Sequence, residues 1–420
     1  MTPLLIAALA LAAEPSAKPP TGWAEFRGPD GTGHYTGPAV PEEWGPKTNV
    51  AWQTPIPGLG WSSPVIHKGK LFLTTAVPKG SGRQADHELR VLCVDAATGK
   101  IDWDELVFVE DGKTAPTPHA KNSHASPTPL TDGERVYVHF GHMGTAAYTP
   151  DGKQVWATQK HAYKPQHGNG GSPILVDDTL VVACDGTDQQ FVLALNKKTG
   201  EQVWKTDRKS KARSRFSFAT PHLIEHKGKR LIISPASDFV AAYDPKDGAE
   251  VWRASYPQAG WSLICRPVYV AGLVVISTGY ETPYLIAVDP GGQGDVTATH
   301  IKWQYKKHPP NTPTPLAIGD VLYCVSDGGV MSCLDAKTGK AHWEEKLKGR
   351  AFSASPVLVN GKIYVTSEDG VGSVVEPSTT ELNATVAGQM GEKTFATPLP
   401  ADGALYLRTE TKLYKFAAKK

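Results

Sequence analysis

The sequence predicts an all-β fold: an eight-bladed β-propeller of four-stranded antiparallel blades, with the ring closed by an N-terminal strand. Three observations support this prediction. Gly and Pro are abundant, with 41 and 34 of 420 residues, which is typical of a chain with many turns. A unit that opens with a small residue or Arg before Pro recurs eight times. Several units also share an Asx-x-x-Thr-Gly turn with a Trp four residues after the Gly.

The unit openers set the number of blades. Consecutive openers are separated by 41 residues (Pro315 to Pro356) to 63 residues (Pro64 to Pro127), and repeats of this length with four strands each are typical of propeller blades. The eight openers are Ser63-Pro64, Ser126-Pro127, Ser172-Pro173, Thr220-Pro221, Arg266-Pro267, Thr314-Pro315, Ser355-Pro356 and Thr397-Pro398.

Within a unit, two apolar strands flank a Gly-containing turn, and a third strand leads into the Thr-Gly turn. Thr98-Gly99 with Trp103 is one copy, and Thr338-Gly339 with Trp343 is another. Gly allows the positive φ of a tight hairpin. The Trp is a large flat side chain suited to packing between neighbouring sheets.

The last unit, residues 394–416, supplies only three strands. We predict that residues 49–53, which precede the first opener and carry Trp52, provide its outer strand. Such closure would remove two unpaired sheet edges. In blade seven Ala384 stands where the Trp is expected, which predicts looser packing of that blade.

The N-terminus is predicted to lie outside the ring. Residues 1–13 have the apolar run and the small-x-small Ala10-Leu11-Ala12 of an export signal, and residues 14–48 form an N-terminal arm before the propeller of residues 49–417. We therefore expect an exported protein, periplasmic or extracellular. Alternatively, the apolar run belongs to the N-terminal arm.

Charge and hydropathy exclude several partners. The 44 Lys and Arg nearly balance 42 Asp and Glu, which disfavours nucleic acid as a partner. No apolar run reaches the roughly 18 residues of a transmembrane helix. We expect a monomer whose partner is a small molecule or an envelope protein.

The five cysteines allow one disulfide hypothesis. A two-residue hairpin turn at Gly328-Gly329 would place Cys324 opposite Cys333 as a non-hydrogen-bonded pair, which a disulfide can bridge. Two buried thiols are the alternative.

The repeat resembles a known family. The Asp-x-x-Thr-Gly-x-x-x-Trp turn resembles the docking motif of pyrroloquinoline-quinone-type eight-bladed propellers, over roughly residues 50–417. The segments at Trp23 to Gly33, Lys121 to Pro127 and His167 to Pro173 resemble secreted bacterial quinoprotein-like propellers, whose function is mostly unassigned.

The resemblance implies two kinds of function. Quinoprotein alcohol dehydrogenases hold pyrroloquinoline quinone and Ca²⁺ at the channel mouth, and many carry a disulfide between adjacent cysteines, which this chain lacks. The outer-membrane assembly scaffold is a propeller lipoprotein without a cofactor, and this chain lacks its lipidated Cys. Pyrroloquinoline quinone or a divalent cation is therefore a candidate cofactor, without a residue-for-residue match.

Positions before the openers predict one funnel at one ring face. Each inner strand starts there, so these segments converge where ligands of propellers can bind. The candidate ligand-binding residues are Trp61, Asn122, His124, His167, Asn169, Arg215, Trp261, Asn311 and Arg350. Trp61 and Trp261 could stack a sugar or quinone ring or fill the channel as packing, and an anionic or flat polar ligand is expected.

A metal site is a second possibility. Six of 14 histidines lie between residues 119 and 167, and acidic turns are predicted on the same face. Imidazole and carboxylate groups can share a divalent metal. The candidate metal ligands are His139, His142, Asp185, Glu281 and Asp327. Hydrogen-bonded histidines and ordinary turn acids are the alternative.

No catalytic residue is identified, since the sequence has no nucleophile elbow, phosphate loop or Cys-His pattern. The sequence favours an exported, non-catalytic propeller that acts as a ligand-binding or protein-interaction scaffold. The alternative is a quinone- or metal-dependent oxidoreductase that uses the channel mouth.

Overall fold

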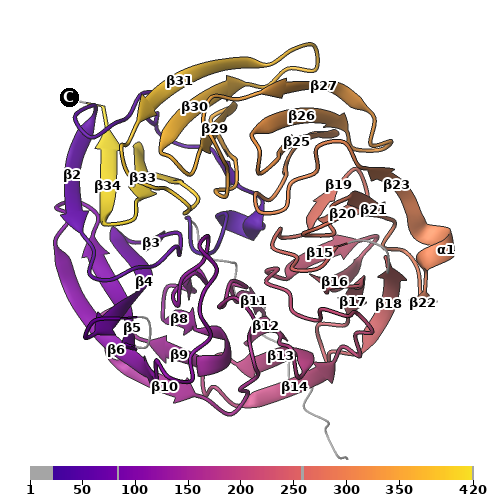
Figure 1. Ribbon diagram of the computed structural model, residues 1–420, viewed down its shortest axis with the longest axis horizontal. Helices are drawn as coiled ribbons and strands as arrows, with labels where there is room; N and C mark the ends of the chain where they lie inside the picture. The colour runs from indigo at the N-terminus through magenta and orange to yellow at the C-terminus, as the bar shows by residue number, and fades with distance from the viewer. Residues whose placement is uncertain (1–21, 83–84, 257–259, 419–420) are drawn as a thin grey trace, which may run out of the picture.

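The computed structural model describes residues 22–82, 85–256 and 260–418. In this part of the chain, eight sheets are arranged as blades around a ring (Figure 1). The predicted eight-bladed antiparallel propeller is confirmed. The predicted export signal lies outside the described residues.

Each blade is a four-stranded antiparallel meander, and the innermost strand follows the unit opener. Blades one to four consist of β3 (Val65–His67), β4 (Lys70–Lys79), β5 (Asp86–Asp95) and β6 (Ile101–Glu110); β7 (Leu130–Thr131), β8 (Val136–His139), β9 (Thr145–Tyr148) and β10 (Gln154–Thr158); β11 (Ile174–Val176), β12 (Thr179–Asp185), β13 (Gln190–Asn196) and β14 (Gln202–Asp207); and β15 (His222–His226), β16 (Lys229–Pro235), β17 (Phe239–Tyr243) and β18 (Glu250–Ser255).

Blades five to eight repeat this plan. They consist of β19 (Val268–Val270), β20 (Leu273–Ser277), β21 (Leu285–Val288) and β23 (Ile301–Tyr305); β24 (Leu316–Ile318), β25 (Val321–Val325), β26 (Val330–Asp335) and β27 (Ala341–Lys346); β28 (Val357–Val359), β29 (Lys362–Thr366), β30 (Val371–Glu376) and β31 (Asn383–Gln389); and β32 (Leu399–Ala401), β33 (Ala404–Arg408), β34 (Lys412–Ala417) and β2 (Val50–Pro55).

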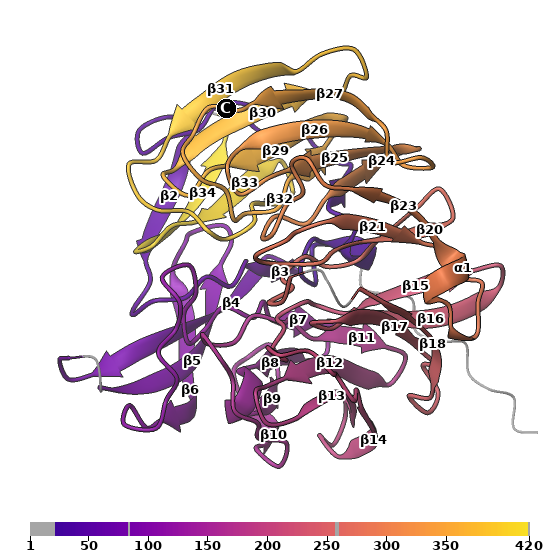
Figure 2. The same ribbon diagram turned by 45° about the vertical axis from the view of Figure 1, so that its right-hand side comes forward.

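Five short elements lie outside this plan, among them the 3-10 helix η1 (Pro29–Gly31) of the N-terminal arm. Strand β22 (Gly294–Asp295) adds to blade four, and strand β1 (His34–Tyr35) pairs with β28. Helix α1 (Thr297–His300) precedes β23, and η2 (Gly141–Met143) joins β8 to β9. Blade one has the longest strands, and the ends of β4 and β5 project from the body of the ring (Figure 2). No helix among the described residues is long and apolar enough to cross a membrane.

The ring closes as the sequence predicts. Strand β2 pairs antiparallel with β34, with Gln53 opposite Tyr414, and thereby forms the outer strand of blade eight. Figure 1 shows these N-terminal and C-terminal strands side by side. Closure leaves no unpaired edge between the first and last blades.

The tryptophans of the outer strands dock on the next blade. The indole N–H of Trp103 in blade one donates to the carbonyl of Pro150 in blade two at 3.0 Å, and Gly152 lies against the same ring. A Cβ on Gly152 would lie 2.9 Å from the indole. The Thr-Gly repeat therefore specifies a contact between blades as well as a hairpin.

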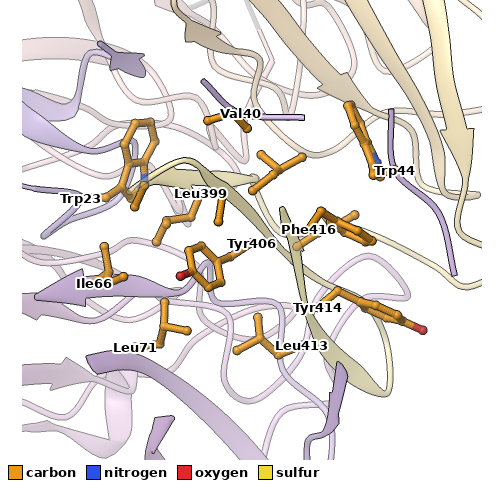
Figure 3. Close-up of a cluster of buried hydrophobic side chains, with 14 of the residues drawn as sticks. Trp23, Val40, Trp44, Ile66, Leu71, Leu399, Tyr406, Leu413, Tyr414 and Phe416 are labelled. Atoms are coloured by element: carbon orange, nitrogen blue, oxygen red, sulfur yellow. The ribbon is translucent and has the colours of Figure 1, made fainter. Parts of the chain in front are cut away.

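Blade seven corrects one prediction. Its outer strand has Ala384, yet the interface with blade eight is filled by Trp44 from the N-terminal arm, which is fully buried and stacks on Tyr364 with 5.6 Å between ring centroids. Figure 3 shows Trp44 within the buried cluster that includes Phe416 and Tyr414. In other blades the Trp docks on the turn that joins the third strand to the outer strand of the next blade. Blade eight has no such turn, because its third strand β34 and its outer strand β2 come from opposite ends of the chain.

The disulfide hypothesis for Cys324 and Cys333 is wrong, and the alternative of two buried thiols holds. The pairing of β25 with β26 is shifted by one residue from the pairing that a two-residue hairpin would give. Cys324 therefore pairs with Ser332, and Cys333 pairs with Tyr323. Neighbouring residues of a strand point to opposite faces, and the two thiols pack in different clusters. All five cysteines are buried thiols.

The unit openers bind the blades to one another. In seven of the eight interfaces the backbone N–H of an opener residue donates to the Ser or Thr hydroxyl of the following blade at 2.9–3.1 Å. We call these hydroxyls the hydroxyl ring: Ser63, Thr128, Ser172, Thr220, Thr314, Ser355 and Thr397. In blade two the equivalent residue is Thr128, not the predicted Ser126. The series is interrupted at blade five, where the opener is Arg266.

The N-terminal arm closes one end of the central channel. Its 3-10 helix η1 (Pro29–Gly31) lies at the centre of the ring in Figure 1. The Arg27 guanidinium is buried and donates to the carbonyls of Thr314 (2.9 Å) and Pro315 (3.1 Å) in blade six. Arg266 in turn donates to the carbonyl of Phe26 at 2.8 Å. Each buried guanidinium thus fixes the arm to the ring.

Backbone hydrogen bonds extend this contact to three further blades. The N–H groups of Ile66, Thr131 and Leu358 donate to the arm carbonyls of Trp23, Ala24 and Gly33 at 2.7–2.9 Å. These three donor residues each lie three residues beyond the hydroxyl ring along the inner strands. The arm therefore plugs the end of the channel opposite the predicted funnel.

Candidate functional site

A cavity of about 730 Å³ occupies the channel between the arm and the funnel face. Phe26 of the arm forms its floor, and all seven members of the hydroxyl ring line its wall. We call this cavity the chamber. Its size lies within the range of about 300–1,000 Å³ that is usual for small-molecule sites.

A second ring of side chains lies two residues before each opener, toward the mouth. Residues i and i+2 of a strand point the same way, so these side chains face the channel as the openers do. All eight line the chamber: Trp61, Ser126, Gly170, Phe218, Ile264, Thr312, Ser353 and Phe395. We call them the upper ring.

The upper ring has two apolar sides and two polar or small sides. Phe395 and Trp61, on blades eight and one, pack edge to face with 4.4 Å between ring centroids. Phe218 and Ile264, on blades four and five, lie across the eight-bladed ring from them (Figure 1). The remaining four blades carry Ser126, Gly170, Thr312 and Ser353. The chamber is thus a slot with two apolar walls and polar edges.

A loop from blades one and two covers part of the mouth. Residues 111–125, the cap loop, form most of the connection from β6 to β7 and carry Lys121. The Lys121 ammonium lies 2.8 Å from the Glu368 carboxylate of blade seven and 3.4 Å from Asp327 of blade six. Because blades two and six are opposite in the ring, this contact reaches across the opening.

Electrostatics favour the closed contact of the cap loop. Burial alone would lower the pKa of the Lys121 ammonium, but the hydrogen bond to Glu368 and the charges of Asp327 and Glu368 outweigh burial and raise the pKa. The loop is also fixed near its tip, since the backbone N–H of His119 donates to the carbonyl of His167 at 3.1 Å.

Five of the nine predicted ligand-binding residues line the chamber. They are Trp61, Asn122, His167, Trp261 and Asn311. Two of them carry buried polar atoms without a partner among the described residues: Nε1 of Trp61 and Oδ1 of Asn311. The Trp61 side chain is 8% exposed.

The other four funnel candidates do not line the chamber. Asn169 is buried beside it and donates to the carbonyl of Phe140 at 3.3 Å. Arg215 lines a more open depression at the rim, which adjoins the chamber through the shared residues His167, Phe216 and Trp261, and Arg350 is exposed. His124 turns away from the channel toward Glu110.

The histidine cluster is organised by a carboxylate that sequence reasoning missed. Glu110, 2% exposed, lies 2.6 Å from Nδ1 of His124 and 3.0 Å from Nε2 of His142. His87 stacks on His124 with 4.2 Å between ring centroids. Burial would raise the pKa of Glu110, but the hydrogen bonds and charges of the two histidines outweigh it and hold that pKa at about 2.

The metal candidates do not gather. His139 is buried and bonds to the Thr145 hydroxyl at 2.9 Å, and Asp185 pairs with the buried Arg208 at 2.6 Å. Glu281 is exposed, whereas Asp327 faces the chamber. Within the described ranges, no three His, Cys, Asp or Glu side chains are grouped so that they could hold a metal ion.

Asp327 instead organises a loop. Its carboxylate accepts from the backbone N–H groups of Asn311 and Thr312, both at 2.9 Å, and from the Thr312 hydroxyl at 2.8 Å. With Lys121 as a fourth partner, this carboxylate is saturated by the protein. The alternative of a turn acid with local hydrogen bonds holds for Asp327.

Sequence reasoning missed several chamber residues. Phe26 lies in the non-repeating arm, so no periodicity pointed to it. The upper ring could have been found from the sequence, because each member lies two residues before its opener. Lys121 was noted within a motif, but its reach across the ring depends on the path of the cap loop.

The fold and the channel site define the class as an eight-bladed propeller of the quinoprotein and assembly-factor type. The chain belongs to the family of outer membrane protein assembly factor BamB, whose sequence profile matches residues 45–214, 188–316 and 236–385. A search of curated proteins finds no sequence match.

Solved structures share the fold at low identity. BamB from Moraxella catarrhalis is 14% identical, with a TM-score of 0.59 over 88% of this chain and 97% of that chain. A europium-containing methanol dehydrogenase is 11% identical, with a TM-score of 0.66 over 94% and 98%. Quinohemoprotein alcohol dehydrogenase ADHIIG from Pseudomonas putida HK5 is 11% identical, with a TM-score of 0.61 over 96% and 81%.

The chamber does not fit pyrroloquinoline quinone. That group is a flat tricarboxylate and requires several cationic partners or a bound metal. Among the described lining residues the only Lys or Arg is Lys121, whose ammonium already contacts two carboxylates. Since the described residues also offer no grouped metal ligands, we derive no reaction step through this cofactor.

Proposed function

We propose that the protein is an exported, monomeric, non-catalytic propeller that holds a small ligand in the chamber. The observation that carries this proposal is the enclosure of the chamber, with the arm as floor and the cap loop across the mouth. A cavity of about 730 Å³ with aromatic walls and a few polar atoms is the usual form of a small-molecule site. The apolar run at residues 4–13 and the outer-membrane family support export.

The two unpartnered atoms add support. A buried indole N–H or amide oxygen without a hydrogen bond costs free energy, and both Trp61 Nε1 and Asn311 Oδ1 lie at the chamber. Both atoms are covered, so a ligand in the chamber would satisfy them after a small rotation of either side chain.

The test is titration of the full chain with the neutral dye N-phenyl-1-naphthylamine, whose fluorescence rises in apolar surroundings. We expect saturable binding to one site. Ile264→Trp, which adds bulk to the upper ring, should abolish it. Val155→Trp, at a 40% exposed position on the outer strand of blade two, is the matched control and should bind as the parent does. Absence of saturable binding, or equal binding by Ile264→Trp, would contradict the proposal.

A protein-interaction role is the second candidate. Leu106 and Val109 are 43% and 47% exposed on β6, in the blade that projects from the ring (Figure 2). Exposed apolar side chains on an outer strand favour contact with another protein. Replacing both by Glu should remove cross-links to envelope proteins in its own host while dye binding in the chamber stays unchanged. Cross-links that persist would contradict this role.

A further inference from the structure

The hydroxyl ring carries unused hydrogen-bonding capacity. Each Ser or Thr hydroxyl has one proton and two lone pairs, and in each of the seven the backbone N–H of the preceding blade takes one lone pair. None of the seven donates a hydrogen bond to another described group. All are 2–4% exposed and line the chamber. Seven hydroxyl protons therefore require acceptors that only the contents of the chamber can provide.

The interior offers little charge to a ligand. Lys121 is paired with Glu368 and Asp327, and Asp327 is saturated by the protein. Arg27 and Arg266 are committed to the carbonyls of the arm and of blade six beneath the floor. Arg213 and Arg215 line the adjoining depression at the rim and not the chamber itself, so the enclosed interior gives an anionic ligand no free cationic partner. A neutral ligand remains.

The shape of the upper ring specifies where that ligand is polar. Phe395 and Trp61 face Phe218 and Ile264 across the slot, so the two broad faces of a ligand would meet apolar side chains. Its edges would meet Thr312 and Ser353 on one side and Ser126 on the other, and its lower rim would meet the hydroxyl ring. The ligand is therefore ring-shaped, with apolar faces and oxygen atoms around its edge.

From this arrangement we infer that the chamber binds a neutral saccharide with a pyranose ring; this inference rests on the proposed function. A pyranose has C–H faces that pack on aromatic rings and hydroxyls around its edge. Hydroxyls exchange donor and acceptor roles freely, so they match seven protein hydroxyls better than the few fixed acceptors of a flat heteroaromatic ring do. Nε1 of Trp61 is unpartnered among the described residues and covered, and a small rotation of the indole on binding would supply one donor to a sugar oxygen.

Trp61 provides a test that leaves the protein's own hydrogen bonds intact. Trp61→Phe removes an indole N–H that no described group accepts, and it keeps an aromatic wall. Trp44→Phe is the matched control, since Nε1 of Trp44 is also buried and unpartnered but lies in the core between blades seven and eight. Calorimetric titration would use glucose, galactose, mannose, N-acetylglucosamine, cellobiose and maltose, with dye binding measured in parallel.

We expect at least one of these sugars to bind saturably and to compete with the dye. Trp61→Phe should weaken sugar binding about three- to tenfold, as for the loss of one hydrogen bond, and leave dye binding unchanged, whereas Trp44→Phe should change neither. Thr220→Val should weaken sugar binding and Thr220→Ser should restore it. Dye binding should stay unchanged in both variants, whereas a purely structural role of this hydroxyl, which accepts the Ser172 N–H, would disturb dye and sugar binding alike.

The other outcomes overturn the inference at different levels. Dye binding without binding of any sugar in the panel overturns the saccharide assignment and leaves the proposed function standing. Sugar binding that is the same in Ile264→Trp or Trp61→Phe as in the parent places the sugar outside the chamber and also overturns it. Failure of both dye and sugar to bind overturns the proposed function together with the inference.

Discussion

The contact between Gly31 and Arg266 gives a sharp test of the plugged channel. A Cβ on Gly31 would lie 2.0 Å from Cζ of Arg266, and Gly31 has φ of +64°. Gly31→Ala therefore combines backbone strain with a collision. Gly69→Ala is the matched control, because Gly69 has φ of +73° and a Cβ there would meet nothing within 4 Å.

The magnitude follows from the two contributions. The left-handed conformation costs an Ala residue about 1–2 kcal/mol at either position. At Gly31 the guanidinium must also move and abandon the Phe26 carbonyl and the Glu25 carboxylate (3.3 Å), and an unsatisfied buried group costs about 1–3 kcal/mol more. Gly31→Ala should therefore lower the free energy of unfolding by about 2–5 kcal/mol, against about 1–2 kcal/mol for Gly69→Ala.

Urea unfolding followed by tryptophan fluorescence measures both values. A double-mutant cycle then isolates the collision: in an Arg266→Ala background, Gly31→Ala should cost no more than Gly69→Ala does in the parent. If Gly31→Ala is as stable as Gly69→Ala, or if the cost of Gly31→Ala is independent of Arg266, the arm does not plug the channel as described.

Three further predictions address closure, acid stability and the cap loop. Trp44→Ala should lower the free energy of unfolding in urea by about 3–5 kcal/mol. Val386→Ala, at a 51% exposed position on blade seven, should change it by no more than about 0.5 kcal/mol. Similar losses in the two variants would refute the role of Trp44. Burial, and to a lesser extent the charge of His142, lowers the pKa of His139 from 6.5 to about 4. Between these pH values the unfolded chain binds a proton at His139 and the folded chain does not, so stability should fall as the pH drops from 6.5 to 4. His139→Asn should reduce this slope by up to about 1.4 kcal/mol per pH unit, and an unchanged slope in chemical unfolding at several pH values contradicts this assignment. Lys121→Met should release the naphthylamine dye several-fold faster in stopped-flow measurements, whereas Lys113→Met, exposed on the same loop, should not; equal rates would show that the Lys121 contacts do not hold the cap.

Repetition made the ring predictable from the sequence. Ser-Pro and Thr-Pro openers recur because each supplies the hydroxyl that accepts from the preceding blade, and Thr-Gly turns recur because each receives a Trp. The error at Ser126 arose since Ser126-Pro127 and Thr128-Pro129 both fit the opener. The register error at Cys324 arose because Gly328-Gly329 fits a two-residue turn that the longer loop from Ser326 to Val330 replaces.

The chamber was only partly predictable. Residues before the openers had to share a face, so Trp61, His167 and Trp261 were found. The floor and the cap come from segments without repeats, in which long-range contacts rather than periodicity decide the path. Glu110 was missed for a related reason, because it ends an outer strand of blade one, and only the fold brings it to His124 and His142.

The most direct test of the central account is a native mass spectrum, with an absorption spectrum, of protein purified from its own host. The enclosed chamber predicts a mass above that of the polypeptide by one small neutral ligand, without quinone absorption, and the same measurement on Ile264→Trp should give the polypeptide mass alone. A polypeptide mass alone for the parent, or a bound quinone, would contradict the account.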